Sequence, residues 1–243
     1  MTLAFPEKSQ EEINKIMKDF YKNFFDIFLE TIKLLTISEK SIRRHMSYGD
    51  MTAVEKFRDQ NRSVILAIGH FGNWELGAVG YSLQNYPNVR GIYKPLSFKL
   101  FDNLMIHIRT RFGGGVYIME ETLKKMRENA QNLTAIGFLA DQNPSSHNAY
   151  WYHLMGRETP VFTSVELFAR KFDFPVVYYR ILRLGRGQYE MNCEVLEEFP
   201  LQTEKYEITH KYIELIEKDI IKHPANWLWT HNRWKRKKED LLS

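Results

Sequence analysis

Apolar side chains recur at every third or fourth position near the start of the chain, and charged residues fill most of the positions between them. This spacing predicts an amphipathic helix over about residues 10–36. Ser9 and Glu12 form a capping box at its start, since each side chain can bond the backbone N–H of the other. We expect the wide apolar face to pack on the core rather than to lie on a membrane. Its members are Ile13, Ile16, Met17, Phe20, Phe24, Ile27, Phe28, Ile32 and Leu35.

Short apolar runs alternate with helical patterns through the rest of the chain. The run over residues 63–69 is continuous and ends in Gly69, which is typical of a strand buried on both faces. Further strands are predicted over 89–93, 115–119, 134–140, 175–184 and 189–196, the last two joined as a hairpin by a glycine-containing turn. Helices are predicted over 76–83, 98–111, 121–129, 162–171 and 204–222.

This alternation predicts an α/β fold with a mostly parallel sheet flanked by helices. A length of 243 residues fits one domain, residues 1–243. Ligands of such sheets sit at the carboxyl ends of the strands. The turns after Gly69, Tyr93 and Ala140 would all lie at that edge, and they are the turns that carry reactive side chains.

Composition and charge narrow the class of protein. Hydrophobic residues make up 44% and charged residues 26%, which favours a globular core over disorder. The net charge of +4 is too small to indicate nucleic-acid binding, and only residues 233–238 form a basic run. The single cysteine, Cys193, excludes a disulfide within the chain. We see no signal-peptide pattern and no uncharged stretch of the roughly 18 residues that a bilayer span needs.

The segment from His70 to Glu75 stands where the first buried strand gives way to a helix. Five residues of regular helix turn by about 140°, so these two side chains meet only if His70 lies on the turn before the helix. Gly69 and Gly72 permit such a turn. A carboxylate on one imidazole nitrogen leaves the other nitrogen to take a proton from an alcohol. We therefore predict His70 as a general base and Glu75 as its partner; the alternative is a turn histidine beside a surface glutamate.

No serine or cysteine stands close to His70 in sequence, and the chain has no Gly-x-Ser-x-Gly elbow. This favours direct attack of an acceptor hydroxyl on a bound thioester, with no acyl-enzyme.

Other polar side chains are candidates for binding substrate. Lys94, Arg111 and Arg157 suit phosphates or an anionic intermediate, although surface salt bridges would also account for them. Asn73 either donates to the acyl carbonyl or bonds the turn. Asp141 either orients one of the cations or caps a helix.

Five blocks of the sequence, in order, resemble the late acyltransferases of lipid A biosynthesis. The first is His70–Glu75, which resembles the H-x4-[D/E] signature of that family. Tyr93-Lys94-Pro95 and Leu139–Gln142 resemble two further blocks. Gly156-Arg157 with Thr159-Pro160 resembles a block on the phosphate side, and residues 224–235, with Trp227, Trp229, His231 and Arg233, resemble the C-terminal signature. The resemblance covers residues 5–235.

The resemblance implies an acyl donor on acyl carrier protein and a phosphorylated glycolipid as acceptor. It implies attachment at the cytoplasmic face of the bacterial inner membrane and a layered fold related to the glycerolipid acyltransferases. No metal or organic cofactor is implied, and the site residues would be His70 and Glu75. Members usually begin with a membrane-anchoring helix, and this chain starts at about the point where that helix has ended, so we expect attachment by this chain alone to be weakened.

Several alternatives share the same residues. An acyltransferase acting on a lysophospholipid or an amino-acid lipid would use the same histidine, and so would a thioesterase in which water replaces the alcohol. A non-enzymatic lipid-binding protein and, from the basic tail alone, a nucleic-acid-binding protein are further alternatives. For Trp227, Trp229 and Trp234 we favour packed rings. The basic residues beside them, Arg233, Lys235, Arg236, Lys237 and Lys238, would form a solvated tail that is weakly attracted to a membrane or that docks an acidic carrier protein.

Overall fold

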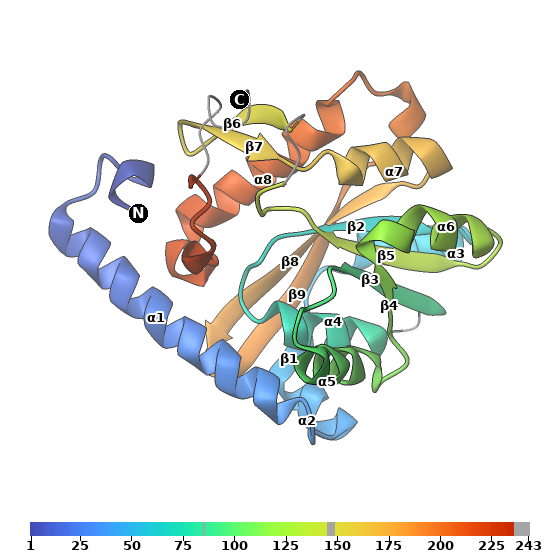
Figure 1. Cartoon of the computed structure of the whole chain (residues 1–243), viewed down its shortest axis with the longest axis horizontal. Coiled ribbons are helices and arrows are strands. Elements are labelled where there is room, and N and C mark those ends of the chain that lie inside the picture. Colours follow the sequence, from blue (N-terminus) through green and yellow to red (C-terminus); the bar gives the residue numbers. More distant parts are fainter. Residues whose placement is uncertain (85, 145–148, 236–243) are drawn as a thin grey trace.

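A seven-stranded sheet forms the centre of the computed structural model, which describes residues 1–84, 86–144 and 149–235 (Figure 1). The strand order is β1-β9-β8-β2-β5-β3-β4. The five strands from β8 to β4 are parallel, β9 runs antiparallel to β8, and β1 is parallel to β9. The predicted mostly parallel α/β sheet is therefore confirmed. The strands are β1 (Met46–Tyr48), β2 (Val64–Ile68), β3 (Asn88–Tyr93), β4 (Gly115–Ile118), β5 (Thr134–Leu139), β8 (Val176–Gly185) and β9 (Gln188–Glu197).

Helices cover both faces of the sheet, and each face has its own hydrophobic core. One core takes side chains from α6, α7 and α8, and the other takes side chains from α2, α3, α4 and α5. In β2 the two faces alternate: Ile65 and Ala67 lie in the first core and Leu66 in the second. The helices are α1 (Gln10–Lys33), α2 (Glu39–His45), α3 (Thr52–Asp59), α4 (Trp74–Ser82), α5 (Lys99–Thr110), α6 (Thr122–Glu128), α7 (Ser164–Phe172) and α8 (Glu207–Lys222).

The first helix begins as predicted but buries less than predicted. Ser9 accepts from the backbone N–H of Glu12, and Glu12 accepts from that of Ser9, so the capping box is confirmed. α1 lies along one border of the molecule (Figure 1), and of its apolar face only Ile13, Phe20 and Ile27 are buried. The expectation that the whole face packs on the core is wrong, because α1 has the rest of the fold on one side only. The exposed side chains are Met17, Tyr21, Phe25, Phe28, Leu29 and Ile32.

Two helices and three strands were not predicted from the sequence. Helices α2 and α3 and strand β1 are short, and too few turns or residues are present for a periodic pattern. The other two strands, β6 (Tyr150–Leu154) and β7 (Arg157–Val161), form a hairpin apart from the main sheet. Its two-residue turn has positive φ at both Met155 and Gly156, and methionine at such a position gives no turn signal.

The C-terminal segment folds back on the sheet edge. Trp227 is buried, and Trp229 and Trp234 pack against the same core, with ring centroids 4.8 to 6.3 Å apart within the cluster. The prediction of packed tryptophans is confirmed. Of the residues predicted to form a basic tail, Lys235 is exposed, but Arg233 is buried and donates to Asn143, so the prediction is wrong for Arg233. Arg236, Lys237 and Lys238 lie outside the described residues.

Candidate active site

Three strand ends bring the polar turns together. β2 and β5 are parallel neighbours with Ile68 opposite Leu139, so the residues that follow them, His70 and Asp141, lie side by side. β3 is the next strand, and Lys94 follows its end. The predicted clustering of these turns at the carboxyl edge of the sheet is therefore confirmed.

His70 is paired with Asp141. Its Nδ1 lies 2.5 Å from Asp141 Oδ1, and its backbone N–H donates to Asp141 Oδ2 over 2.9 Å. Because a carboxylate accepts this bond, the proton belongs on Nδ1, and Nε2 presents its lone pair. Gln142 Nε2 lies 3.3 Å from His70 Nε2, and the Trp74 ring packs edge-on against the imidazole. The side chain of His70 keeps 14% of its surface exposed, so Nε2 is within reach of a substrate.

Asp141 is held as a carboxylate. Its side chain is buried, and Trp227 Nε1–H donates to Oδ2 over 2.9 Å. Burial alone raises the pKa of Asp141, but the His70 charge and the hydrogen bonds from His70 and Trp227 outweigh burial and lower the pKa from 3.8 to about 2. Asp141 can therefore stabilise an imidazolium and fix its orientation.

Glu75 does not occupy the position predicted for it. Its carboxylate accepts two hydrogen bonds from Arg109 of α5, at 2.9 Å from Nε and 2.5 Å from Nη2. The partner of His70 is Asp141 instead, so the predicted His70–Glu75 contact is wrong. The physical reason is that Glu75 is already inside α4, in its first turn, while Asp141 follows the neighbouring strand directly beside the His70 turn. The prediction that His70 precedes the helix holds, since α4 begins at Trp74.

The turn that carries His70 is fixed on both sides. Gly72 has φ of +52°, and a Cβ there would lie 2.8 Å from the Ile181 carbonyl oxygen, so only glycine fits. Asn73 is buried and caps α4 by accepting from the Leu76 N–H, while its amide donates to Glu30 of α1. Of the two roles left open for Asn73, the structure supports the one of bonding the turn.

The C-terminal segment clamps the same turn. Phe71 and Trp227 form an antiparallel bridge, in which Gly72 N–H donates to the Asn226 carbonyl and Leu228 N–H donates to the His70 carbonyl. Further along, the guanidinium of buried Arg233 donates to the side chain of Asn143, two residues beyond Asp141. The segment therefore holds both halves of the His70–Asp141 pair.

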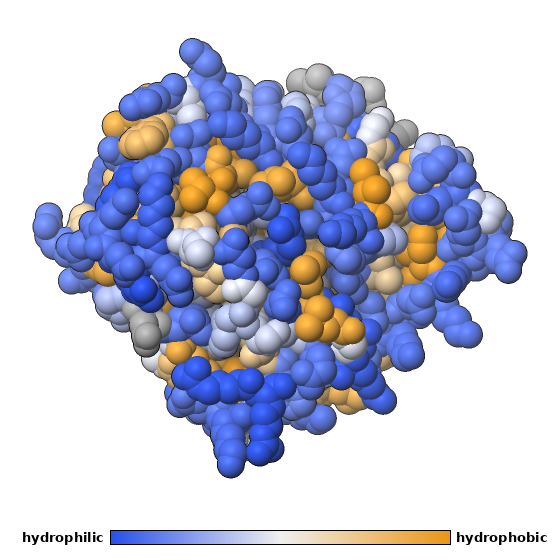
Figure 2. Space-filling view, turned by 180° about the vertical axis from the view of Figure 1, so that it is seen from behind, coloured by the Kyte–Doolittle hydropathy of each residue, from blue (hydrophilic) through white to orange (hydrophobic). Residues whose placement is uncertain are grey.

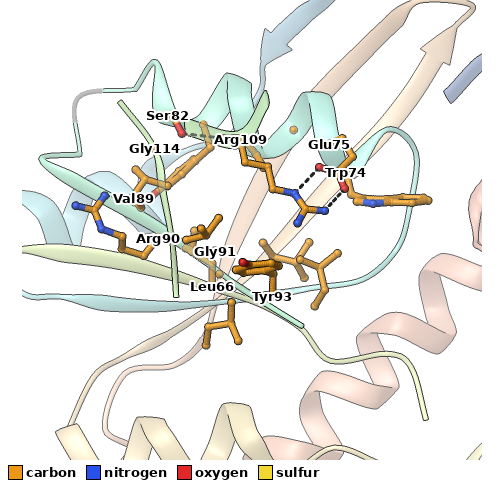
Figure 3. A pocket seen from close by; sticks show the side chains of 18 of the residues that line it. Leu66, Trp74, Glu75, Ser82, Val89, Arg90, Gly91, Tyr93, Arg109 and Gly114 are labelled. Carbon is orange, nitrogen blue, oxygen red and sulfur yellow. Dashed lines mark hydrogen bonds and ion pairs between the residues drawn. The ribbon is translucent and has the colours of Figure 1, made fainter. Parts of the chain in front are cut away.

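A mainly apolar pocket of about 360 Å³ opens beside His70 and runs between α4 and the sheet (Figure 3). Its size is that of a small-molecule site. In Figure 3, Trp74 and Glu75 lie at one end, Ser82 and Gly114 lie at the other, and the side chain of Arg109 extends from between them to Glu75. Apolar side chains from β2, β3, β5 and β8 form its floor, namely Leu66, Ile68, Val89, Tyr93, Leu139, Tyr179 and Ile181.

The comparisons with known proteins agree with this site. A model of the family described as bacterial lipid A biosynthesis acyltransferase matches residues 1–236. The chain belongs to this family. It is also similar to the lipid A biosynthesis lauroyltransferase of Escherichia coli (strain K12), at 24% identity over 248 residues, covering 100% of this chain and 79% of that protein. The protein is thus an acyltransferase family member of lipid A biosynthesis, as its motifs indicated.

Members of this family are associated with the inner membrane. Among the residues that the structure describes, no helix has both the length and the apolar character required to cross a bilayer.

The three cations predicted to bind substrate lie in different places in this acyltransferase. Lys94 lines the pocket mouth and is exposed. Arg111 ends α5, donates to the Leu34 carbonyl and lies against the Phe112 ring, so it is a structural contact between α5 and the end of α1. Arg157 begins β7 and lies 4.7 Å from the Trp234 ring centroid, outside the pocket lining. Only Lys94 is brought to the pocket.

Some residues of the site were missed by the sequence reasoning. Arg109 and Gln142 line the pocket and Trp227 donates to Asp141. Arg109 was not named from the sequence, and Gln142 and Trp227 were named only as parts of sequence blocks, without a role at the site. Asp141 was named, but for another role. The sequence did contain a signal for Asp141, because it follows a buried strand in the same way as His70 does. The pairing of the two residues, however, depends on strand order, which the sequence pattern does not encode. In residues 1–84, 86–144 and 149–235, no three histidine, cysteine or acidic side chains group as metal ligands would.

Proposed function

We propose that this acyltransferase moves a fatty acyl chain from acyl carrier protein to a hydroxyl of a lipid A precursor, with His70 as general base and Asp141 as the carboxylate that orients it. The observation that carries the proposal is the position of the His70–Asp141 pair at the mouth of the apolar pocket. The pocket supplies a place for a hydrocarbon chain, and the imidazole supplies the base at its opening.

The chemistry follows from Nε2 of His70, the ring nitrogen that does not contact Asp141 and that faces the pocket beside Gln142. Nε2 takes the proton of the acceptor hydroxyl as its oxygen attacks the thioester carbonyl. The tetrahedral intermediate collapses to the ester, the C–S bond breaks, and the imidazolium returns its proton to the leaving thiolate. Asp141 stabilises the imidazolium between the two steps. No covalent acyl-enzyme forms, and the oxygen of the acceptor ends in the new ester.

Lys94 is the cation best placed to meet a phosphate of the acceptor or the oxyanion of the intermediate, because it is exposed at the pocket mouth. The charges of Glu75 and Arg109 balance each other, and their two hydrogen bonds join α4 to α5. The role of this pair in the proposal is to hold the pocket wall in place.

We further propose that the protein acts at the cytoplasmic face of the inner membrane, through the exposed face of α1. Its apolar side chains at positions 17, 21, 25, 28, 29 and 32 follow helical spacing and form one stripe. Exposed lysines border this stripe, namely Lys15, Lys18, Lys22 and Lys33. An apolar stripe edged with lysines fits the surface of an anionic bilayer. On the side of the molecule seen in Figure 2, hydrophobic surface is broken into separate patches.

The test of the reaction is an assay with labelled acyl carrier protein and a panel of acceptors. The panel contains a lipid A precursor, a lysophospholipid, an amino-acid lipid and water alone. Transfer to the lipid A precursor is expected, and His70→Ala should lower its turnover by about 10²- to 10⁴-fold while the fold is kept. Near wild-type turnover of His70→Ala would falsify the assignment of the base, and free fatty acid as the main product would indicate a thioesterase.

A further inference from the structure

The floor of the pocket has a gap where two glycines face each other on adjacent strands. Gly91 of β3 and Gly137 of β5 are direct partners in the parallel register, and both line the pocket. Paired residues of parallel strands point to the same face of the sheet. Val89 and Tyr93, two residues before and after Gly91, also line the pocket, so side chains on this face of β3 project into it.

The two glycines differ in what a side chain would meet. A Cβ built on Gly91 has no atom within 4 Å, and its backbone lies outside the left-handed region. A Cβ on Gly137 would lie 3.3 Å from Ile68 Cδ1, which is a tight contact. Backbone strain therefore does not explain glycine at position 91, and in a strand interior glycine costs stability. The space above Gly91 is open pocket.

This gap lies in the middle of the pocket. In Figure 3, Gly91 and Leu66 stand between the end marked by Trp74 and Glu75 and the end marked by Ser82 and Gly114. Above it, α4 presents Gly77 and Ala78 to the pocket. Small residues above and below leave a narrow apolar passage, about 12 Å long if measured along α4 from residue 74 to residue 82.

We propose that Gly91 is the residue that decides how long an acyl chain this protein accepts. The inference rests on the proposed function in one respect, namely that the occupant is a linear hydrocarbon chain whose carbonyl lies at His70. A chain longer than the distance from His70 to Gly91 passes over the glycine gap toward Ser82, and a side chain at position 91 stops it there. A shorter acyl chain ends before the gap and does not contact residue 91.

The test is a graded series, Gly91→Ala, Gly91→Val and Gly91→Leu, in the full chain. Gly185→Val is the matched control, because a Cβ at Gly185 also meets nothing within 4 Å and Gly185 lies outside the pocket lining. Thermal unfolding should show all variants folded, with melting temperatures of the Gly91 series unchanged or raised, since glycine in a strand interior costs conformational entropy and the β-branched valine also favours a strand.

The first measurement is binding, which does not require turnover. Octanoate and hexadecanoate compete with a fluorescent fatty acid for the pocket. Each methylene kept out of an apolar site costs about fourfold in affinity. Gly91→Leu should therefore weaken hexadecanoate binding by about tenfold or more and leave octanoate unchanged, with Gly91→Ala in between. Equal loss for both acids, or no loss for either, would overturn the proposal.

The second measurement is transfer from octanoyl-, dodecanoyl- and hexadecanoyl-acyl carrier protein. The Gly91 series should shift the preference toward the shortest donor, and Gly185→Val should keep the wild-type preference. If the wild type transfers no acyl group but the binding shift appears, the proposed function fails and the assignment of Gly91 stands. If transfer occurs and the preference does not shift in the Gly91 series, the assignment of Gly91 fails and the proposed function stands.

Discussion

At the scale of single residues, the decisive feature is which carboxylate holds His70. A buried carboxylate is costly unless hydrogen bonds satisfy it, and Asp141 receives three, two from His70 and one from Trp227. Glu75 is satisfied by a bidentate pair with Arg109. Each carboxylate thus has a full set of partners, and the two are not interchangeable.

We expect Asp141→Asn and Glu75→Gln to separate activity from stability. Asp141→Asn should lower turnover by about 10²- to 10⁴-fold, because the imidazolium loses its counter-charge and the tautomer is no longer fixed. Glu75→Gln should lower turnover by less than about tenfold but reduce the free energy of unfolding by about 1–3 kcal/mol, since Arg109 loses its partner in a mostly buried site. Steady-state rates and denaturant unfolding of both variants give the comparison. Adding Arg109→Met to Glu75→Gln should recover stability, and a larger rate loss in Glu75→Gln than in Asp141→Asn would contradict the assignment.

Asp141 should also change how the free energy of unfolding depends on pH in acid. Its pKa is about 2 in the folded protein and 3.8 is its ordinary value, so the folded state holds this carboxylate ionised. The stabilisation is present above about pH 4 and is lost as pH falls toward about 2, where the folded state also takes up the proton; its size is on the order of 2 kcal/mol. Unfolding free energy measured against pH should show a steeper acid decline in the wild type than in Asp141→Asn. Parallel curves would show that Asp141 is not held in this way.

At the scale of elements, the C-terminal segment is part of the site although it lies about 160 residues from His70 in sequence. It reaches the site through a backbone bridge at Phe71 and Trp227 and through the Trp227 indole. α1 reaches the same turn from the other side, through Glu30 and Asn73. The position of His70 is thus set by the C-terminal segment, by α1 and by the turn after β5 that carries Asp141, which are remote from one another along the chain.

Trp227→Phe isolates the hydrogen bond of this segment to Asp141. The ring remains, but Asp141 Oδ2 loses one donor, so its pKa should rise and turnover should fall by about tenfold. Trp229→Phe is the control, since its indole N–H donates to the Pro224 carbonyl instead. The measurements are turnover and the pH at which acid unfolding sets in, which should move upward for Trp227→Phe only. The same acid shift in both variants would mean that ring packing, not the bond to Asp141, is what matters.

The elements also show where sequence reasoning succeeded and where it stopped. Apolar periodicity and strand-helix alternation predicted the parallel sheet and placed the turns after Gly69, Tyr93 and Ala140 at one edge. They did not give strand order, and β2 beside β5 is what brings Asp141, rather than Glu75, to His70. Glu75 was chosen because it is close to His70 in sequence, and contacts between residues far apart in sequence are not visible in the pattern. The short helices α2 and α3 escaped because packing, not periodicity, stabilises them.

At the scale of the whole molecule, six apolar residues of α1 face outward, while its polar residues Asn23, Asp26 and Glu30 contact the fold beside the buried Ile13, Phe20 and Ile27. Asp26 binds Arg183 and Arg186, and Glu30 binds Asn73 and Tyr189. A surface helix of a protein that meets only water has the opposite arrangement. This arrangement supports the proposal that the outer face of α1 meets an apolar phase. Among the described residues, no helix could span a bilayer.

Phe25→Ser with Phe28→Ser tests this arrangement directly, because both rings are more than half exposed and neither contributes to a core cluster. Each phenylalanine that enters a bilayer interface contributes about 1.5–3 kcal/mol, so the double variant should lose about 10²-fold or more in partitioning onto anionic vesicles. Leu167→Ser is the matched control, since Leu167 is 60% exposed but lies on α7. The fraction of protein that floats with the vesicles should also fall when salt is added or when the vesicles are zwitterionic. The reason is that the lysines beside the stripe are attracted by the negative surface potential of anionic lipids. If the double variant and Leu167→Ser float with vesicles equally well, α1 is not the surface that meets the membrane. If only the double variant loses vesicle binding, and it keeps its turnover on detergent-dispersed substrate, membrane docking is separate from the chemistry.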